Sequence, residues 1–116
     1  PLRYLGYPTT RNFIALIADR QSRALLAALE QALRVGCHLP TASIAVPWRG
    51  HLLPECRLSD HANFWDQGYP AVMLTDTAFL RNPYYHTPRD VIAHLDFDAM
   101  VELTLGLYYF IRNHPA

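Results

Sequence analysis

Residues 12–46 decide the fold, and they read NFIALIADRQSRALLAALEQALRVGCHLPTASIAV. The first part, 12–18, is a short apolar run rich in strand-forming residues, which predicts a buried β-strand. Residues 42–46 (ASIAV) predict a second strand, which ends at Pro47.

The segment between these two runs has the spacing of a helix. Ser22 can cap its start, and Gly36 provides a C-terminal stop. Apolar side chains recur on one face at steps of three and four residues: Leu25, Ala28, Leu29, Ala32 and Leu33. We therefore expect a helix that covers the sheet formed by the flanking strands.

The rest of the chain continues this alternation. Residues 48–57 predict a loop, and residues 60–67 predict a short helix. Another apolar strand is expected over 70–75 (PAVMLT). Residues 76–89 contain two prolines and few aliphatic side chains, so they predict a long irregular loop.

The last element is a long helix that Asp96 caps and that runs to about Asn113. Its apolar positions form a stripe that other apolar residues widen: Val101, Leu105 and Tyr108, then Leu103, Leu107, Phe110 and Ile111. Such a helix is expected to pack on more than one side. The predicted fold class is α/β, a mixed sheet of about three to four strands flanked by helices, in a single domain over 1–116.

Composition excludes two broad classes of partner. Ten arginines and ten acidic residues give no formal net charge, whereas nucleic-acid-binding domains usually carry a basic excess. No apolar run approaches the ~18 residues that a membrane-spanning helix needs. All cations are arginine, a bias that we attribute to a GC-rich bacterial coding sequence, and no compartment follows from it.

Two further features concern the state of the chain. It opens at Pro1 within an apolar stretch, so we expect a fragment, a processed product or a trimmed chain. Cys37 and Cys56 could pair, but two cysteines in an apolar domain are more often buried thiols.

Polar side chains gather directly after the strand expected at 70–75. The loop opens with Asp76 and contains Tyr85, His86 and Asp90. In open α/β sheets, sites form just beyond strand ends, and loops longer than about 12 residues are usually functional or disordered. His86 could bind zinc through a neutral imidazole whose second nitrogen Asp90 holds. The local alternative is a hydrogen-bonded surface histidine.

A second polar cluster is Ser59-Asp60-His61. These residue types occur in hydrolytic triads, but three consecutive residues cannot form one because their side chains diverge. The local alternative is a helix start, in which Ser59 is the N-cap and Asp60 lies at the positive end of the helix dipole.

Several motifs together resemble one enzyme family. They are residues 59–71 (SDHANFWDQGYPA), 74–79 (LTDTAF), 81–83 (RNP), 85–90 (YHTPRD) and 95–96 (LD). As an ordered set they closely resemble the co-catalytic zinc aminopeptidases, bacterial enzymes whose wider family includes glutamate carboxypeptidases and glutaminyl cyclases. The family pattern runs S-D-H-x-x-F, G-x-P, Y-H-x-x-x-D and L-D. The resemblance covers nearly the whole chain.

This resemblance implies a fold and a chemistry. The fold would be the C-terminal half of a zinc-exopeptidase (phosphorylase/hydrolase-like) domain. In the family, two zinc ions and a glutamate base activate water for attack on a peptide carbonyl. The resemblance makes His86 a zinc ligand in the intact parent, Tyr85 a donor to the developing oxyanion, and Asp60 a neighbour of the metal site. The supporting residues would be Asp76, Asp90 and His61.

The resemblance also implies that the metal site is incomplete in these residues. The other ligands and the base come earlier in family sequences, so we expect this chain to bind zinc weakly and to be inactive alone. In residues 2–7 (LRYLGY), Arg3 stands where the family has a carboxylate ligand, and a cation there would repel zinc. The sheet would be cut, with an edge that another copy or a missing segment covers.

Two alternatives stay open at this point. The chain could be a non-catalytic binding or structural member of the same fold, as the transferrin receptor and nicastrin are. It could also be one half of an enzyme that another chain completes. Arg3 favours the first alternative, and the retained Tyr85-His86 pair argues against long neutral drift.

Overall fold

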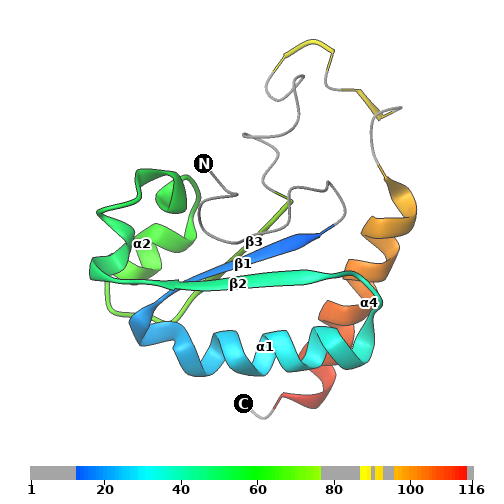
Figure 1. Cartoon of the computed structure of the whole chain (residues 1–116), viewed down its shortest axis with the longest axis horizontal. Coiled ribbons are helices and arrows are strands. Elements are labelled where there is room, and N and C mark those ends of the chain that lie inside the picture. The colour runs from blue at the N-terminus through cyan, green and yellow to red at the C-terminus, as the bar shows by residue number, and fades with distance from the viewer. Residues whose placement is uncertain (1–12, 77–86, 90, 93–95, 115–116) are drawn as a thin grey trace.

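The structure is a computed structural model that describes residues 13–76, 87–89, 91–92 and 96–114. Its sheet contains β1 (Ile14–Asp19), β2 (Thr41–Val46) and β3 (Val72–Thr75), in the order β2-β1-β3 (Figure 1). The helices are α1 (Arg23–Gly36), α2 (His61–Asp66) and α4 (Phe97–Asn113). Short 3-10 turns lie at Arg20–Ser22, Trp48–Gly50 and Pro54–Arg57.

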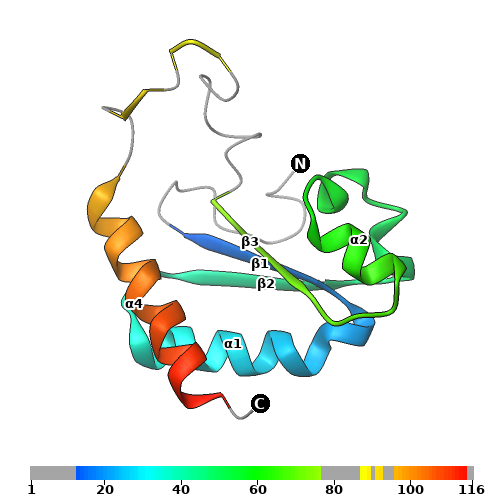
Figure 2. The ribbon, with the colours of Figure 1, turned by 180° about the vertical axis from the view of Figure 1, so that it is seen from behind.

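The sheet is mixed, which confirms the predicted fold class. β1 and β2 are parallel, with Ile14 opposite Thr41, and α1 makes the crossover between them. β3 is antiparallel to β1, with Ala15 opposite Thr75 (Figure 2). The end of β3 therefore lies beside the start of β1.

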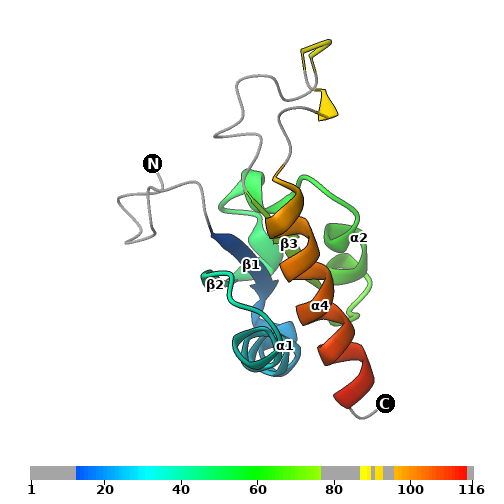
Figure 3. The ribbon, with the colours of Figure 1, turned by 90° about the vertical axis from the view of Figure 1, so that its right-hand side faces the viewer.

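One face of the sheet packs against α1 and α4. Leu16 and Ala18 of β1 are fully buried there, because alternate strand residues point to the same face. The helices contribute Leu26, Leu29, Leu33, Leu103, Leu107 and Phe110. Figure 3 shows α1 and α4 crossing on this side of the sheet.

The opposite face carries a second, smaller core around Trp65 of α2. Its indole ring is fully buried and packs with Ile17 and Val46. Ile17 is the neighbour of Leu16, so successive residues of β1 serve the two cores. This arrangement fixes α2, and with it the Ser59-Asp60-His61 motif at its start, against the sheet.

Two details of α1 differ from the prediction. Leu29, Ala32 and Leu33 are buried as predicted, but Leu25 is only half-buried and Leu26 is buried in its place. Ser22 occupies the N-cap position but makes no cap hydrogen bond. Its hydroxyl donates instead to Asp19, 2.5 Å away, and accepts from the backbone N–H of Ala71 at 2.9 Å.

The prediction that the last helix packs on more than one side is wrong for the described chain. Asp96 caps α4 as expected, accepting a hydrogen bond from the N–H of Ala99. Its packed side carries Leu103, Gly106, Leu107 and Phe110. Most of its other large apolar residues are exposed, among them Val101, Leu105, Tyr108 and Ile111.

Cys37 is a buried free thiol and Cys56 a half-buried one, which confirms that they are not paired. In the described ranges, no helix combines the length and the apolar character needed to cross a lipid bilayer.

Changing Gly36 to alanine is expected to lower the free energy of unfolding by about 1–3 kcal/mol, as overpacking of a core usually does. A Cβ on Gly36 would lie 2.8 Å from Cβ of Tyr109 and 3.2 Å from the backbone Cα of Gly106. Neither atom is a flexible side-chain end, so the helices must separate, and this outweighs the helix propensity gain of about 1 kcal/mol. Urea unfolding measures the change.

The matched control is the neighbouring Val35→Ala, at a side chain that is 65% exposed. Its effect should stay within about 0.5 kcal/mol. A Gly36→Ala protein that is as stable as the parent would contradict the close helix crossing.

Candidate functional site

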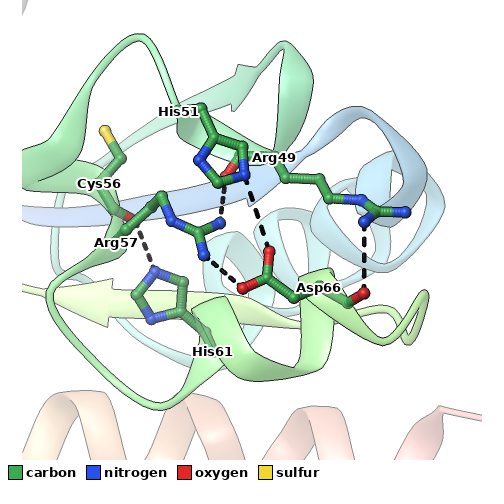
Figure 4. Close-up of polar contacts among 6 residues, drawn as sticks. All are labelled: Arg49, His51, Cys56, Arg57, His61 and Asp66. Carbon is green, nitrogen blue, oxygen red and sulfur yellow. Dashed lines mark hydrogen bonds and ion pairs between the residues drawn. The ribbon is translucent and has the colours of Figure 1, made fainter.

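The Ser59-Asp60-His61 motif is held by the buried ring of His61. Its Nε2 lies 2.6 Å from the carbonyl oxygen of Cys56 (Figure 4). Its ring also meets Trp65 edge-to-face, with centroids 4.5 Å apart. Because a carbonyl oxygen can only accept, Nε2 carries a proton and donates it to Cys56. Nδ1 is buried and has no hydrogen-bond partner within the described residues. His61 therefore ties the preceding loop to α2.

Asp60 lies at the start of α2, and its carboxylate is exposed. The predicted N-cap, Ser59, is wrong by one residue: the N-cap is Asp60, and it makes no side-chain cap bond. Asp60 already has helical dihedral angles (φ −63°, ψ −25°), so its side chain does not reach back over the first turn. The carboxylate is left available to groups outside the helix.

An ionic network closes the loop in front of α2. Arg57 donates to Asp66 at 2.5 Å and to the carbonyl oxygen of Arg49 at 2.7 Å (Figure 4). His51 Nε2 lies 3.9 Å from the same Asp66 carboxylate. The hydrogen bond from Arg57 lowers the pKa of Asp66 below its ordinary value, against a smaller opposing effect of burial. The network therefore holds the loop residues Arg49, His51 and Arg57 against Asp66, the last residue of α2.

This network restrains a strained turn. Trp48 and Arg49 have positive φ angles of 47° and 53°, which are uncommon for residues other than glycine. Gly50 follows with φ +77°, and a Cβ there would lie 3.3 Å from the Trp65 ring. Conformations of this kind persist where their surroundings fix them, and cost about 1–3 kcal/mol each. Arg57 and Trp65 provide that restraint.

Burial changes the acidity of the Cys56 thiol, which lies in this loop. The pKa of Cys56 is raised, first by desolvation and then by the negative charge of Glu55. A thiol with a raised pKa stays protonated at neutral pH, which disfavours a role as nucleophile or metal ligand.

A buried hydrogen-bond relay, which the sequence analysis missed, supports the segment before β3. Asp19 accepts from the N–H of Ser22 at 2.9 Å and from its hydroxyl, and that hydroxyl accepts from Ala71. Asp19 is 2% exposed. The Asp-x-x-Ser spacing is a common turn signal and could have revealed the first two bonds, but not the contact with Ala71, which is distant in sequence.

Asp76 directly follows β3, as predicted, and is exposed. Tyr85, His86, Asp90 and Arg3 lie outside the described residues, so their roles and the proximity of Asp60 to His86 stay predictions. Among the described residues, no group of three or more His, Cys, Asp or Glu side chains could hold a metal ion. These residues do not by themselves form a zinc site.

Comparison with known proteins decides the family. Residues 10–111 match the model of Peptidase family M28. The chain belongs to this family. This confirms the resemblance to zinc aminopeptidases that rested on the ordered motifs, and no solved structure gives a significant match.

Among the relatives is the uncharacterized protein YfbL of Escherichia coli (strain K12), 33% identical over 107 residues, which are 92% of this chain and 32% of YfbL. Leucine aminopeptidase 1 of Trichophyton equinum is 32% identical over 88 residues, 75% of this chain and 21% of that protein. Leucine aminopeptidase 1 of Metarhizium robertsii is 36% identical over 76 residues, which are 60% of this chain and 19% of that protein. The chain thus spans a third or less of the curated relatives that it matches.

Asp66→Asn removes the carboxylate and is expected to reduce the loss of folding stability at acid pH. The pKa of Asp66 is lower in the folded protein than in the unfolded chain, where it is near 3.8, so the ionised carboxylate stabilises the fold at pH values above 3.8. This stabilisation is lost as the pH falls through the folded pKa. The parent should therefore lose more stability than the variant between about pH 5 and pH 2. Urea midpoints across this range measure it.

The control is the same substitution in an Arg57→Met background, which keeps an apolar stem but no hydrogen-bond donor. There, Asp66→Asn should change the pH dependence much less. An equal change in both backgrounds would show that Arg57 is not the cause of the pKa shift.

Proposed function

We propose that this chain is the C-terminal part of a zinc-dependent aminopeptidase-type exopeptidase. The observation that carries the proposal is the family match over residues 10–111, which includes the ordered S-D-H and Y-H motifs. Two relatives are named leucine aminopeptidase, and this supports aminopeptidase activity, the removal of N-terminal residues from peptides, over other peptidase activities for the whole protein.

In this proposal the motif residues divide the work. His86 supplies one imidazole ligand to zinc, which polarises the scissile carbonyl and lowers the pKa of bound water when present. Tyr85 donates a hydrogen bond to the carbonyl oxygen as negative charge develops there. Asp60 lies near the site as an exposed carboxylate, and Asp76 and Asp90 support the loop.

His61 has a positioning role in the proposal. Its Nε2 is already bonded to the Cys56 carbonyl, and its ring packs on Trp65, so it fixes the direction in which Asp60 leaves the loop. Its Nδ1 is buried and has no hydrogen-bond partner among the described residues, and we expect a group from elsewhere in the protein to provide one.

The isolated chain is expected to bind zinc weakly and to show no peptidase activity. A zinc site of useful affinity needs three or four protein ligands, and the motifs in these 116 residues supply one, His86. The remaining ligands and the general base would belong to the larger part of the domain, which the relatives contain and this chain does not span.

Two preparations test the proposal: the purified 116-residue chain, and the full protein encoded by the gene that carries this segment. The full protein should hydrolyse leucine p-nitroanilide and lose activity with a chelator, whereas the isolated chain should show none with added zinc. Chelator-sensitive turnover by the isolated chain would refute its proposed inactivity. A full protein that binds peptides without cleaving them would refute the catalytic proposal and support a binding module.

A further inference from the structure

The residue pattern of β3 does not by itself fix the register of this strand on β1. Val72 and Leu74 pack toward the core formed with α1 and α4, whereas Met73 packs toward the smaller core around Trp65. All three are apolar and half-buried, so a shift by one residue would still give each core an apolar side chain. No tight turn joins the two strands either, since α1, β2 and α2 lie between them in the chain. The register therefore depends on contacts outside β3.

Ala71, the residue before β3, is held by side chains at both of its backbone groups. Its N–H donates to Ser22 Oγ at 2.9 Å, and its carbonyl oxygen accepts from Trp65 Nε1 at 2.9 Å. The pairing of the strands begins with the next residue, Val72, which lies opposite Ala18. Figure 2 shows the segment from α2 entering β3 beside the start of α1. The bonds to Ala71 thus act at the point where β3 is placed on β1.

Ser22 is itself fixed by the last residue of β1. Its N–H and its hydroxyl both donate to Oδ1 of Asp19, at 2.9 and 2.5 Å, and the two residues are 1% and 2% exposed. Because the hydroxyl proton is used by Asp19, the hydroxyl oxygen acts toward Ala71 as an acceptor. Hydrogen bonds in such a chain polarise one another, so donation to Asp19 strengthens the bond from Ala71. Ser22 therefore holds Ala71 at a set place relative to the end of β1.

A second bond from the same 3-10 turn supports this placement. Gln21 Nε2 donates to the carbonyl oxygen of Gly68, which has a φ angle of +80° and lies between α2 and β3. This contact is exposed to water, whereas the Ser22 hydroxyl is buried. Hydrogen bonds are electrostatically stronger where water is excluded, so the bond from Ala71 to Ser22 is the main restraint.

The register of β3 decides where the chain leaves the sheet. Thr75 lies opposite Ala15, and Asp76 follows directly. A shift of one residue would move this exit by about 3.3 Å and turn the strand side chains to the opposite face. In the proposed function the segment that starts at Asp76 carries Tyr85 and His86, and a metal ligand tolerates an error of only about 0.2 Å in its distance.

We propose that Ser22 is a positioning residue. Through its bond to Ala71 it sets the register of β3 on β1, and thereby the start of the segment that carries Tyr85 and His86. The part that concerns zinc rests on the proposed function, whereas the register does not. Ser22 and Asp19 are buried within the described chain, so their contacts do not depend on what covers its outer surface in a longer protein.

NMR spectroscopy of the 116-residue chain tests the register. In the parent, cross-strand NOEs should join Ile17 to Met73, which face each other in the sheet. In Ser22→Ala these NOEs should give way to contacts shifted by one residue, and the Ala71 amide should exchange with solvent about tenfold faster or more. Ser22→Cys fills nearly the same space, but a thiol accepts only weakly, so this variant should behave as the alanine variant does.

The full protein tests the positioning role. Ser22→Ala should weaken zinc binding at one site and lower kcat on leucine p-nitroanilide, each by about 10- to 100-fold, the usual effect of losing a group that orients a metal ligand. The matched control is Gly36→Ala, which is expected to lose stability at the crossing of α1 and α4 but to leave the pairing of β1 and β3 intact. It should keep its zinc and its kcat. A purely structural role of Ser22 would make the two variants alike.

Either of two outcomes overturns the proposal. Unchanged NOEs between Ile17 and Met73 in both Ser22 variants would show that β3 keeps its register without the bond. Zinc affinity and kcat equal to those of Gly36→Ala would show that Ser22 does not position the segment after β3. A parent protein with neither zinc nor peptidase activity would instead refute the proposed function, and the NOEs alone would then decide whether Ser22 sets the register.

Discussion

In a full peptidase that contains this segment, His86→Ala is expected to lower zinc affinity at one site by several orders of magnitude. The imidazole nitrogen supplies a lone pair, which a methyl group cannot replace, and the loss leaves an open coordination position. Structural and catalytic zinc sites depend on each of their few protein ligands. Metal analysis after dialysis measures the effect, with a melting curve to report on folding.

Tyr85→Phe is the informative neighbour, because it should spare zinc and slow turnover. Loss of one oxyanion donor typically costs about 2–4 kcal/mol of transition-state stabilisation, or about 10²–10³ in kcat. If both residues only pack or hydrogen-bond in a loop, both variants lose stability and keep their metal. Unaltered zinc stoichiometry in the His86→Ala protein would remove the basis of the assignment.

The strand–helix–strand start of the fold follows from the sequence because its signals are local. Apolar runs at 12–18 and 42–46 and a helical repeat between them predict β1, α1 and β2, and the structure places all three within two residues of the expected bounds. The burial of Leu26 instead of Leu25 at the start of the α1 stripe has a different origin. Both leucines fit helical spacing, and only the position of the sheet and α4 decides which one is buried.

The outer face of α4 shows a limit of pattern reasoning. Val101, Tyr108 and Ile111 carry the apolar signal of buried residues, yet they are exposed in the described chain. Periodicity reports that a face needs a partner but does not report whether the partner belongs to the same chain. The prediction of packing on several sides was therefore wrong for the single chain.

The candidate site was predictable in its residue types but not in its contacts. The S-D-H motif is visible in the sequence, whereas the bond of His61 to Cys56 and that of Ser22 to Ala71 depend on tertiary structure. The second joins residues 49 positions apart. No local spacing carries information about such a pair, so sequence reasoning assigned Ser22 the simpler role of a cap.

Trp65→Ala is expected to lower the free energy of unfolding by about 3–5 kcal/mol, the usual cost of removing a large buried aromatic. The ring is fully buried between Ile17 and Val46, and its N–H donates to the Ala71 carbonyl at 2.9 Å. The substitution leaves a cavity in the smaller core and that carbonyl without its donor. Chains of this size are stable by about 5–15 kcal/mol, so much of the margin is at stake.

Two further variants separate the contributions of the Trp65 ring and its N–H, and provide a control. Trp65→Phe keeps much of the apolar volume but not the N–H, so it should cost less than alanine and isolate the bond to Ala71. Phe64→Ala changes the adjacent aromatic of α2, which is 53% exposed, and should shift stability far less. Urea unfolding of the three proteins ranks them.

Because the His61 ring rests edge-on against the Trp65 indole, the alanine variant should also free the His61 resonance from its ring-current shift in NMR spectra at native conditions. An unshifted resonance together with near-parent stability would mean that α2 does not rest on this core.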